Sequence, residues 1–119
     1  PLHALCLQSG LIVCSYADRW NSGSFRATIS SDGGRTWQHE RTKVLHGGLP
    51  KPQTRLSGPG QWLGGTGSAQ LSDGRIFVFY SVPDIRNLKK TDAGKTTKGH
   101  SYVAGNIVTE AFLLGDRSN

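Results

Sequence analysis

One short stretch, residues 29–38 (ISSDGGRTWQ), gathers side chains that could bind a metal ion or a sugar. It contains Ser30, Asp32, Gly34, Thr36 and Trp37 close together. A single carboxylate without an acidic neighbour is a poor metal site, so we expect no metal here. The alternative is a locally stabilised turn. In such a turn the aspartate accepts backbone N–H bonds, glycine permits a positive φ, the hydroxyls close the remaining bonds and the indole turns inward.

The long irregular segments combine positive charge with aromatic rings, which suits an acidic sugar. A guanidinium group binds a carboxylate through two parallel hydrogen bonds, and an aromatic ring covers the face of a sugar. These groups lie in residues 17–23, 46–65 and 82–100. Functional loops are commonly irregular segments of this kind on a rigid scaffold. The candidate ligand-binding residues are Arg19, Trp20, Trp62, Arg86 and His100.

Other chemistries find less support in the sequence. Residues 93–97 (AGKTT) lack the glycine at position 89 that a phosphate-binding loop needs, and a solvated loop is the other interpretation. The cysteines and histidines show no zinc-binding spacing, and we expect no cofactor. The net charge of +6 attracts anionic partners but serves solubility equally well. Nucleic acid is not expected because the basic loop lacks interleaved aromatics, and no apolar run is long enough to cross a membrane.

The scaffold that holds these segments is predicted to be all-β. The chain has 119 residues, one domain's worth, with 16 glycines and no sustained apolar recurrence at helical spacing. Residues 7–16 (LQSGLIVCSY) resemble residues 71–80 (LSDGRIFVFY), and a Ser-Gly or Asp-Gly pair between two apolar runs predicts a tight hairpin. Residues 24–27 and 101–104 supply a third strand, which follows its hairpin after a longer segment in the second copy. Two imperfect copies of an antiparallel unit indicate a repeat architecture such as propeller blades.

The two cysteines are predicted to be buried and free. A two-residue turn at residues 9–10 would pair Cys6 with Val13 and Leu5 with Cys14. Because side chains alternate along a strand, the two sulfur atoms would then lie on opposite faces of the sheet. We therefore expect two buried thiols and no disulfide.

Residues 30–37 fit the pattern S-x-D-x-G-x-T-W, which resembles the Asp-box, or BNR repeat, of sialidases and related β-propellers. Strand-like segments flank this pattern at residues 24–29 and 36–45. The resemblance implies that Ser30, Asp32, Gly34, Thr36 and Trp37 form a structural corner. It also implies that this corner lies on the propeller face away from the active site.

The second half of the chain resembles the same group without an Asp-box. Residues 64–81 are similar to an inner-strand hairpin of bacterial sialidase-like proteins, with Gly65 and Thr66 where an aromatic–proline pair would stand. Residues 101–114 resemble a closing strand region, and residues 107–110 occupy the place of the Asp-box. This arrangement is typical of a terminal blade, whose last strand is often supplied by the other end of the chain.

The resemblance implies about two antiparallel four-stranded blades of a six-bladed β-propeller. Residues 1–47 would form a blade with the Asp-box at 30–37, and residues 48–65 would cross to the next blade. Residues 66–119 would form a second, terminal-type blade with a long basic loop at 82–100.

The resemblance also implies a sialidase-like exo-glycosidase segment that acts on acidic glycans or sialosides. Sialidases of this family use an arginine cluster on the substrate carboxylate and a tyrosine nucleophile assisted by a glutamate. The candidates are Arg55 in the crossover and Tyr80 at the end of a strand. A packing role like that of the repeated Tyr16 is the alternative for Tyr80.

A non-catalytic glycan-binding or structural propeller module remains the second hypothesis. Two blades cannot surround a sugar, and an isolated pair would leave sheet faces uncovered, so whether the chain is an enzyme stays open. We expect it to form a homo-oligomer, such as a trimer that builds a six-bladed ring, or to belong to a longer propeller. The chain begins with Pro1 rather than Met and shows no signal segment, so we expect a processed N-terminus or a piece of a larger protein; the compartment stays open.

Overall fold

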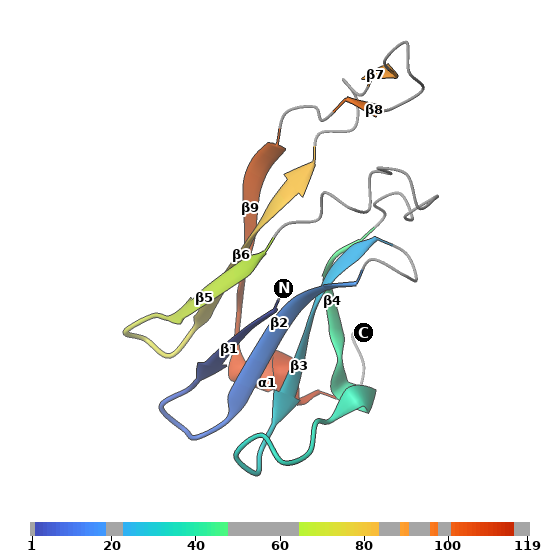
Figure 1. Ribbon diagram of the computed structural model, residues 1–119. Coiled ribbons are helices and arrows are strands. Elements are labelled where there is room, and N and C mark those ends of the chain that lie inside the picture. Colours follow the sequence, from blue (N-terminus) through green and yellow to red (C-terminus); the bar gives the residue numbers. More distant parts are fainter. Residues whose placement is uncertain are drawn as a thin grey trace.

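Antiparallel β-sheets make up most of the described chain (Figure 1). The computed structural model describes residues 2–18, 23–47, 65–83, 89–90, 96–97 and 101–115. The first sheet has the order β1-β2-β3-β4 and contains β1 (Leu2–Cys6), β2 (Ile12–Asp18), β3 (Ser24–Ser30) and β4 (Lys43–His46). The second has the order β5-β6-β9 and contains β5 (Thr66–Gln70), β6 (Ile76–Pro83) and β9 (Ser101–Val108). The predicted all-β class is confirmed.

The β1–β2 hairpin closes through a longer turn than the sequence suggested. The N–H of Leu7 donates to the carbonyl of Leu11, and the N–H of Gly10 donates to the carbonyl of Leu7. Gly10 has a φ of 93°, the left-handed conformation that a turn followed by a bulge requires. The predicted two-residue turn is therefore wrong by one residue, and Cys6 pairs with Ile12.

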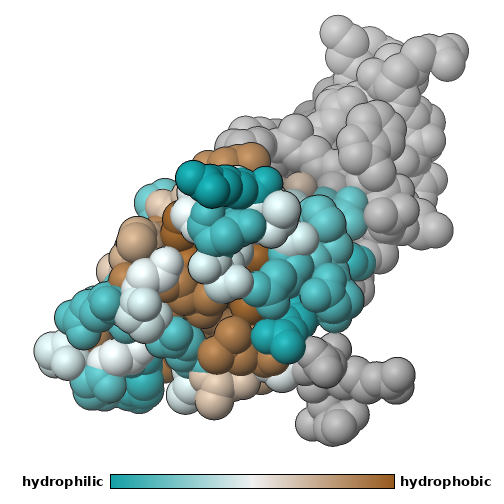
Figure 2. Space-filling model, turned by 90° about the horizontal axis from the view of Figure 1, so that it is seen from below, coloured by the Kyte–Doolittle hydropathy of each residue, from teal (hydrophilic) through white to brown (hydrophobic). Residues whose placement is uncertain are grey.

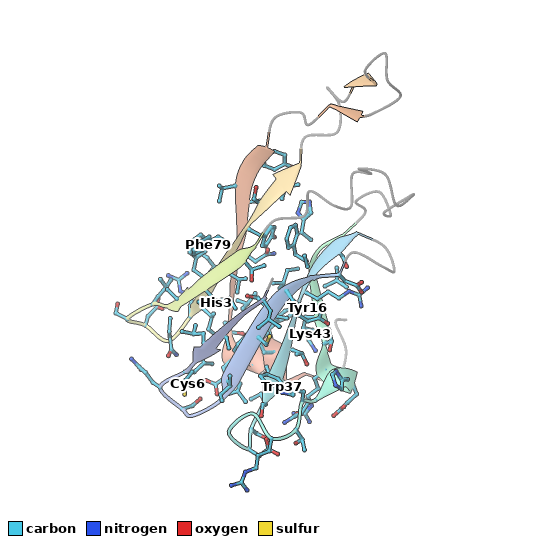
Figure 3. All side chains as sticks on the ribbon, in the orientation of Figure 1. His3, Cys6, Tyr16, Trp37, Lys43 and Phe79 are labelled. Atoms are coloured by element: carbon cyan, nitrogen blue, oxygen red, sulfur yellow. The ribbon has the colours of Figure 1, made fainter. Side chains whose placement is uncertain are left out.

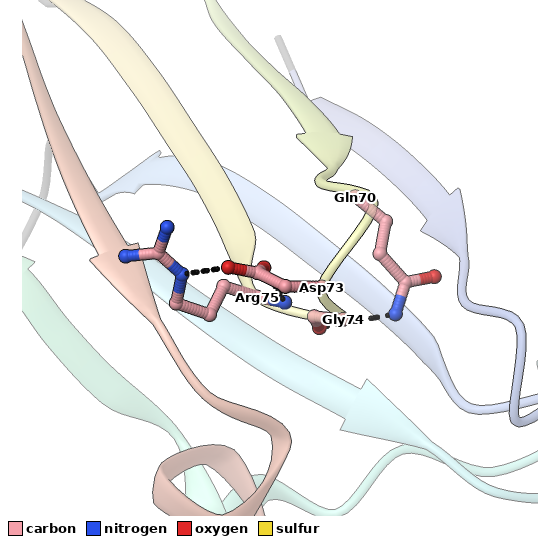
Figure 4. A network of polar contacts seen from close by, with 4 residues as sticks. All are labelled: Gln70, Asp73, Gly74 and Arg75. Atoms are coloured by element: carbon pink, nitrogen blue, oxygen red, sulfur yellow. Dashed lines mark hydrogen bonds and ion pairs between the residues drawn. The ribbon is translucent and has the colours of Figure 1, made fainter.

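The β5–β6 hairpin repeats this geometry (Figure 4). Leu71 N–H donates to the Arg75 carbonyl, and Gly74 has a φ of 92°. Two side-chain contacts brace the turn: Arg75 Nε lies 2.8 Å from Asp73 Oδ2, and Gln70 Nε2 donates to the Gly74 carbonyl at 3.1 Å. Each cross-strand pair of the first hairpin recurs at the equivalent place in the second, so the two predicted hairpins are confirmed.

The third strands correspond one position later than predicted. Asp18 pairs with Ser24, whereas its counterpart Val82 pairs with Tyr102, so Ser24 corresponds to Tyr102 rather than to Ser101. The reason is that hydrogen bonding to β6, rather than sequence likeness, sets the register of β9. A shift of one residue exchanges the two faces of a strand, so the predicted match between residues 24–27 and 101–104 is wrong.

The start of the predicted loop at residues 82–100 is also regular structure. β6 extends through residue 83 and pairs there with the first residues of β9. Within the predicted loop, β7 (Lys89–Lys90) pairs with β8 (Thr96–Thr97) in a small antiparallel sheet. The remaining residues of this segment lie outside the described ranges.

The two larger sheets lie against each other and share one hydrophobic core. The first sheet contributes Val13, Phe25, Ala27 and Ile29, and the second contributes Ile76, Val78, Tyr80 and Val82. The ring of Phe25 stacks on that of Tyr80 with centroids 4.4 Å apart, and Ser15 Oγ and Thr66 Oγ1 lie 2.8 Å apart. These contacts join the two sheets.

Equivalent positions of the two hairpins face the core in the second sheet and face away from it in the first sheet. In β6, Ile76 and Tyr80 face the core. Their counterparts in the first hairpin, Ile12 and Tyr16, lie on the side of β2 away from it, because the intervening Val13 faces the core. The face of the second sheet that packs against the first sheet is therefore equivalent to the outer face of the first sheet.

The connection after the Asp-box corner differs from the predicted strand at residues 36–45. The structure has a 3-10 helix at His39–Arg41, and β4 begins only at Lys43. Local bonds from Arg41 N–H to the Gln38 carbonyl and from Thr42 N–H to the His39 carbonyl hold this helical turn. The first half of the predicted strand is wrong for this reason.

A short helix, α1 (Glu110–Leu114), stands where the second unit would carry an Asp-box. Thr109 caps it by accepting a hydrogen bond from the Phe112 N–H at 3.1 Å, and Leu113 enters the common core. The buried ammonium group of Lys43 donates to the carbonyls of Gly115 and Arg41, which ties the helix end to β4. Among the described residues, no helix has the length and apolar character needed to span a membrane.

The cysteine prediction is partly wrong. Cys14 pairs with Ala4, and Cys6 lies two residues beyond Ala4, so both thiols belong to the same side of the sheet. Both cysteines are free, Cys14 is buried, and Cys6 is exposed rather than buried. Burial raises the pKa of the Cys14 thiol. The error follows directly from the turn, because one extra turn residue moves every side chain of β2 to the other face.

Candidate functional site

The corner at residues 30–37 is closed by its own side chains. Asp32 Oδ1 accepts hydrogen bonds from Ser30 Oγ and from the Thr36 N–H, each at 2.9 Å, and Asp32 Oδ2 accepts one from Thr36 Oγ1 at 2.5 Å. Ser30 Oγ in turn accepts the Gly34 N–H at 2.9 Å. Gly34 has a φ of 90°, which explains the need for glycine at this position. The expected local hydrogen bonds are therefore present.

Trp37 and the backbone complete the corner. The indole of Trp37 is half-buried beside Gly34, close to the end of β3 in Figure 3. The Gln38 N–H donates to the Ile29 carbonyl at 2.8 Å, so the chain returns to the sheet directly after the indole. Within the described ranges, no group of three or more His, Cys, Asp and Glu side chains could hold a metal ion.

Hydrogen bonding controls the acidity of Asp32. The Thr36 hydroxyl and N–H, followed by the Ser30 hydroxyl, lower the pKa of Asp32 to about 2. Both carboxylate oxygens accept bonds from the corner itself. The carboxylate therefore works as the centre of a local hydrogen-bond network rather than as a free ligand group.

We expect the Asp32→Asn variant to be less stable than the wild type near neutral pH and to lose the acid sensitivity of this corner. The ionised carboxylate stabilises the fold above the unfolded-state pKa of about 3.9. This contribution disappears as the pH falls toward the folded-state value of about 2. Melting temperatures followed by circular dichroism from about pH 5 to about pH 2 measure it.

Glu40→Gln is the matched control for Asp32→Asn, because it removes an exposed carboxylate on the neighbouring 3-10 helix. The melting temperatures of the wild type and Asp32→Asn should converge at the acid end of the pH range. The melting temperature of Glu40→Gln should follow that of the wild type at every pH. An Asp32→Asn curve parallel to that of the wild type at every pH would contradict this assignment.

Tyr80 lies inside the protein, between the two sheets. Its side chain is 2% exposed and stacks on Phe25, and His46 lies next to it with ring centroids 5.7 Å apart. The hydroxyl donates a hydrogen bond to Asn106 Oδ1. Burial raises the pKa of the phenol.

Asn106 was not identified by the sequence analysis. Its amide accepts from Tyr80 and donates from Nδ2 to the carbonyl of Leu45 at 3.1 Å, so it connects β6, β9 and β4. The sequence feature that could have identified it is an asparagine within a run of β-forming residues. Asparagine is depleted in strands, and its side chain needs hydrogen-bond partners when it is buried.

The remaining candidate residues lie outside the described ranges. These are Arg19, Trp20, Arg55, Trp62, Arg86 and His100. The structure therefore places Tyr80 and the five Asp-box residues, and gives no geometry for the candidate arginine cluster.

A shallow depression of about 280 Å³ lies at the turn end of the sheets. Its lining residues are Ser9, Gly10, Leu11, Ser31, Glu110 and Leu114. The carboxylate of Glu110 accepts a hydrogen bond from Ser9 Oγ at 2.6 Å, so its main polar group already joins the first hairpin to α1. The depression therefore lies where the β1–β2 turn, the corner after β3 and α1 meet, and we do not assign it a ligand.

Comparisons of the chain with protein-family models, with curated proteins and with solved structures give no match.

Proposed function

We propose that the chain forms two neighbouring blades of a sialidase-like β-propeller and serves there as a non-catalytic module for acidic glycans. The observation that carries the proposal is the way the sheets stack. Two meandering sheets with the same hairpin corner lie against each other, and equivalent positions point in the same rotational sense. Radial repetition of such sheets is the principle of a propeller.

The environment of Tyr80 favours a binding module over an enzyme. A tyrosine nucleophile must reach its substrate and needs a neighbouring base, because the free phenol has a pKa near 10. Tyr80 is 2% exposed, and its hydroxyl donates to an amide oxygen rather than to a carboxylate. Burial raises its pKa further, which disfavours the phenolate. These contacts suit a packing residue that fixes β6 to its neighbours.

The composition of the long segments supports acidic glycans as the ligand. They contain arginines together with tryptophans and histidines, in residues 17–23, 46–65 and 82–100. Arginine binds a sugar carboxylate in two-pronged fashion and tryptophan stacks on the ring, so the combination recognises both parts of a sialoside. Binding through these groups requires no reaction at Tyr80.

The Tyr80→Phe variant tests this proposal. We expect it to bind sialylated glycans like the wild type, to show no turnover of a fluorogenic sialoside, and to lose about 1–3 kcal/mol of unfolding free energy because Asn106 loses its hydroxyl partner. A glycan array, the sialoside assay and urea unfolding measure the three effects.

Arg55→Ala is the matched variant for binding. Loss of a charge-assisted contact to the sugar carboxylate should weaken binding about tenfold or more. Turnover by the wild type that Tyr80→Phe abolishes would overturn the non-catalytic assignment. Binding that survives only at low salt would show general charge attraction instead of glycan recognition.

A further inference from the structure

Both large sheets carry an apolar outer face. On the first sheet we call this the head face. Its exposed or half-buried apolar side chains are Leu2, Ala4, Cys6, Ile12, Tyr16 and Val44, and Asp18 and Arg26 lie on the same face. On the second sheet we call it the tail face, formed by Phe77, Phe79, Val103 and Ile107. Leu2 is 68% exposed and Val103 is 73% exposed, and such apolar faces usually mark interaction sites.

Figure 2 views the molecule from below, and hydrophobic residues, in brown, reach the surface among hydrophilic ones, in teal. Figure 3 labels Phe79 beside β5 and β6, and Tyr16 on β2. Arg26, which lies in the same cross-strand row as Tyr16, is paired with Asp18 at 3.5 Å, so its charge is compensated.

The tail face corresponds position by position to the inner face of the first sheet. When the two hairpins are aligned by their cross-strand pairs, Phe77 is the counterpart of Val13. When the third strands are aligned by their pairing with β2 and β6, Val103, Gly105 and Ile107 are the counterparts of Phe25, Ala27 and Ile29. These four inner residues are buried against the second sheet, so the tail face repeats a surface already built to receive a sheet.

The head face corresponds in the same way to the surface that the second sheet buries. Ile12, Cys14 and Tyr16 are the counterparts of Ile76, Val78 and Tyr80, all of which lie in the core. The two outer faces of the chain are therefore equivalent to the two faces that pack together inside it. The tail face repeats the inner face of the first sheet, and the head face repeats the inner face of the second sheet.

The internal contacts predict which side chains would meet outside. The stack of Tyr80 on Phe25 corresponds to Tyr16 against Val103, and the hydroxyl contact of Thr66 with Ser15 corresponds to Leu2 against Phe79. A polar pair is thus replaced by an apolar one. The rings of Phe77 and Phe79, with centroids 5.5 Å apart, lie over Gly105 and Gly67, respectively.

We propose that the tail face of one chain binds the head face of a second copy, in the orientation that the two sheets have within the chain. Such a contact joins two different surfaces, so each bound copy offers a further free head or tail face until a ring closes. The proposal depends on register and exposure alone, and glycan binding could fail without affecting it.

A pair of complementary variants tests this contact. Leu2→Glu places a charge in the head face and Val103→Glu places the same charge in the tail face, both at strongly exposed positions where folding tolerates them. The wild type should have several times the monomer mass in sedimentation velocity, and each variant alone should be monomeric. An equal mixture of the two variants should form a dimer, because each contributes the face that the other has lost.

Ser72→Glu, at an exposed position in the β5–β6 turn, is the control and should keep the mass of the wild type. Circular dichroism establishes that all three variants are folded. A wild type that stays monomeric would overturn the proposal. So would a mass that only one of the two face variants reduces, which indicates a symmetric contact of one face with itself, or a mixture that stays monomeric.

Discussion

Replacing Phe25 by alanine is expected to lower the free energy of unfolding by about 3–5 kcal/mol. The ring is fully buried, and it stacks on Tyr80 with the two ring planes inclined by 16°. Truncation removes the transfer free energy of the ring and leaves a cavity between the two sheets. Because Phe25 belongs to β3 and Tyr80 to β6, the loss falls on the contact that unites the halves of the chain.

Urea unfolding checks this expectation, since a lower midpoint with an unchanged slope reports a loss of stability. Phe25→Leu is the matched control, because leucine keeps most of the apolar contact and should cost less than alanine. Equal midpoints for Phe25→Leu and Phe25→Ala would show that the ring does not fill the joint core.

The second large effect is expected at Gly105 on β9. A Cβ atom there would lie 2.5 Å from Phe77 Cε1 and 2.9 Å from the carbonyl oxygen of Val78. The ring could turn, but the carbonyl belongs to the ladder between β6 and β9 and cannot move without loss of hydrogen bonding. We expect Gly105→Ala to destabilise the protein by about 1–3 kcal/mol, measured by urea unfolding.

Gly67→Ala provides the comparison. The three heavy atoms nearest to a Cβ atom at Gly67 all belong to the ring of Phe79, which is 39% exposed and can swing toward solvent. The cost of Gly67→Ala should therefore be the smaller of the two. The opposite order would mean that the backbone of β6 yields more easily than the Phe79 ring.

Local turn chemistry made both hairpins and the corner at residues 30–37 predictable. Gly10 and Gly74 mark the two hairpins because each adopts a positive φ that other residues rarely adopt. The Ser-x-Asp-x-Gly-x-Thr pattern specifies hydrogen-bond partners close together in the chain, and these bonds form as expected around Asp32. Interactions of this range can be recognised in a sequence without knowledge of the remaining fold.

The register was less accessible, because two-residue and three-residue turns both suit a Ser-Gly pair. The hairpin has the three-residue turn, and Cys14 and its neighbours therefore lie on the opposite face of the sheet from the predicted one. The 3-10 helix at His39–Arg41 was not predicted for a related reason. Local N–H hydrogen bonds compete there with strand pairing, and the residues have no strong preference for a strand or a helix.

The sequence by itself determined the β class, the two hairpins and the hydrogen-bonded corner, because short-range geometry specifies all three. Only the tertiary structure decided which side of each strand is covered. It placed Tyr80 between Phe25 and Asn106, although the sequence also made Tyr80 a candidate for a catalytic role. It also left the head and tail faces exposed. The physical reason is that burial depends on residues distant in the chain, and the described residues hold no further large sheet that covers the outer faces.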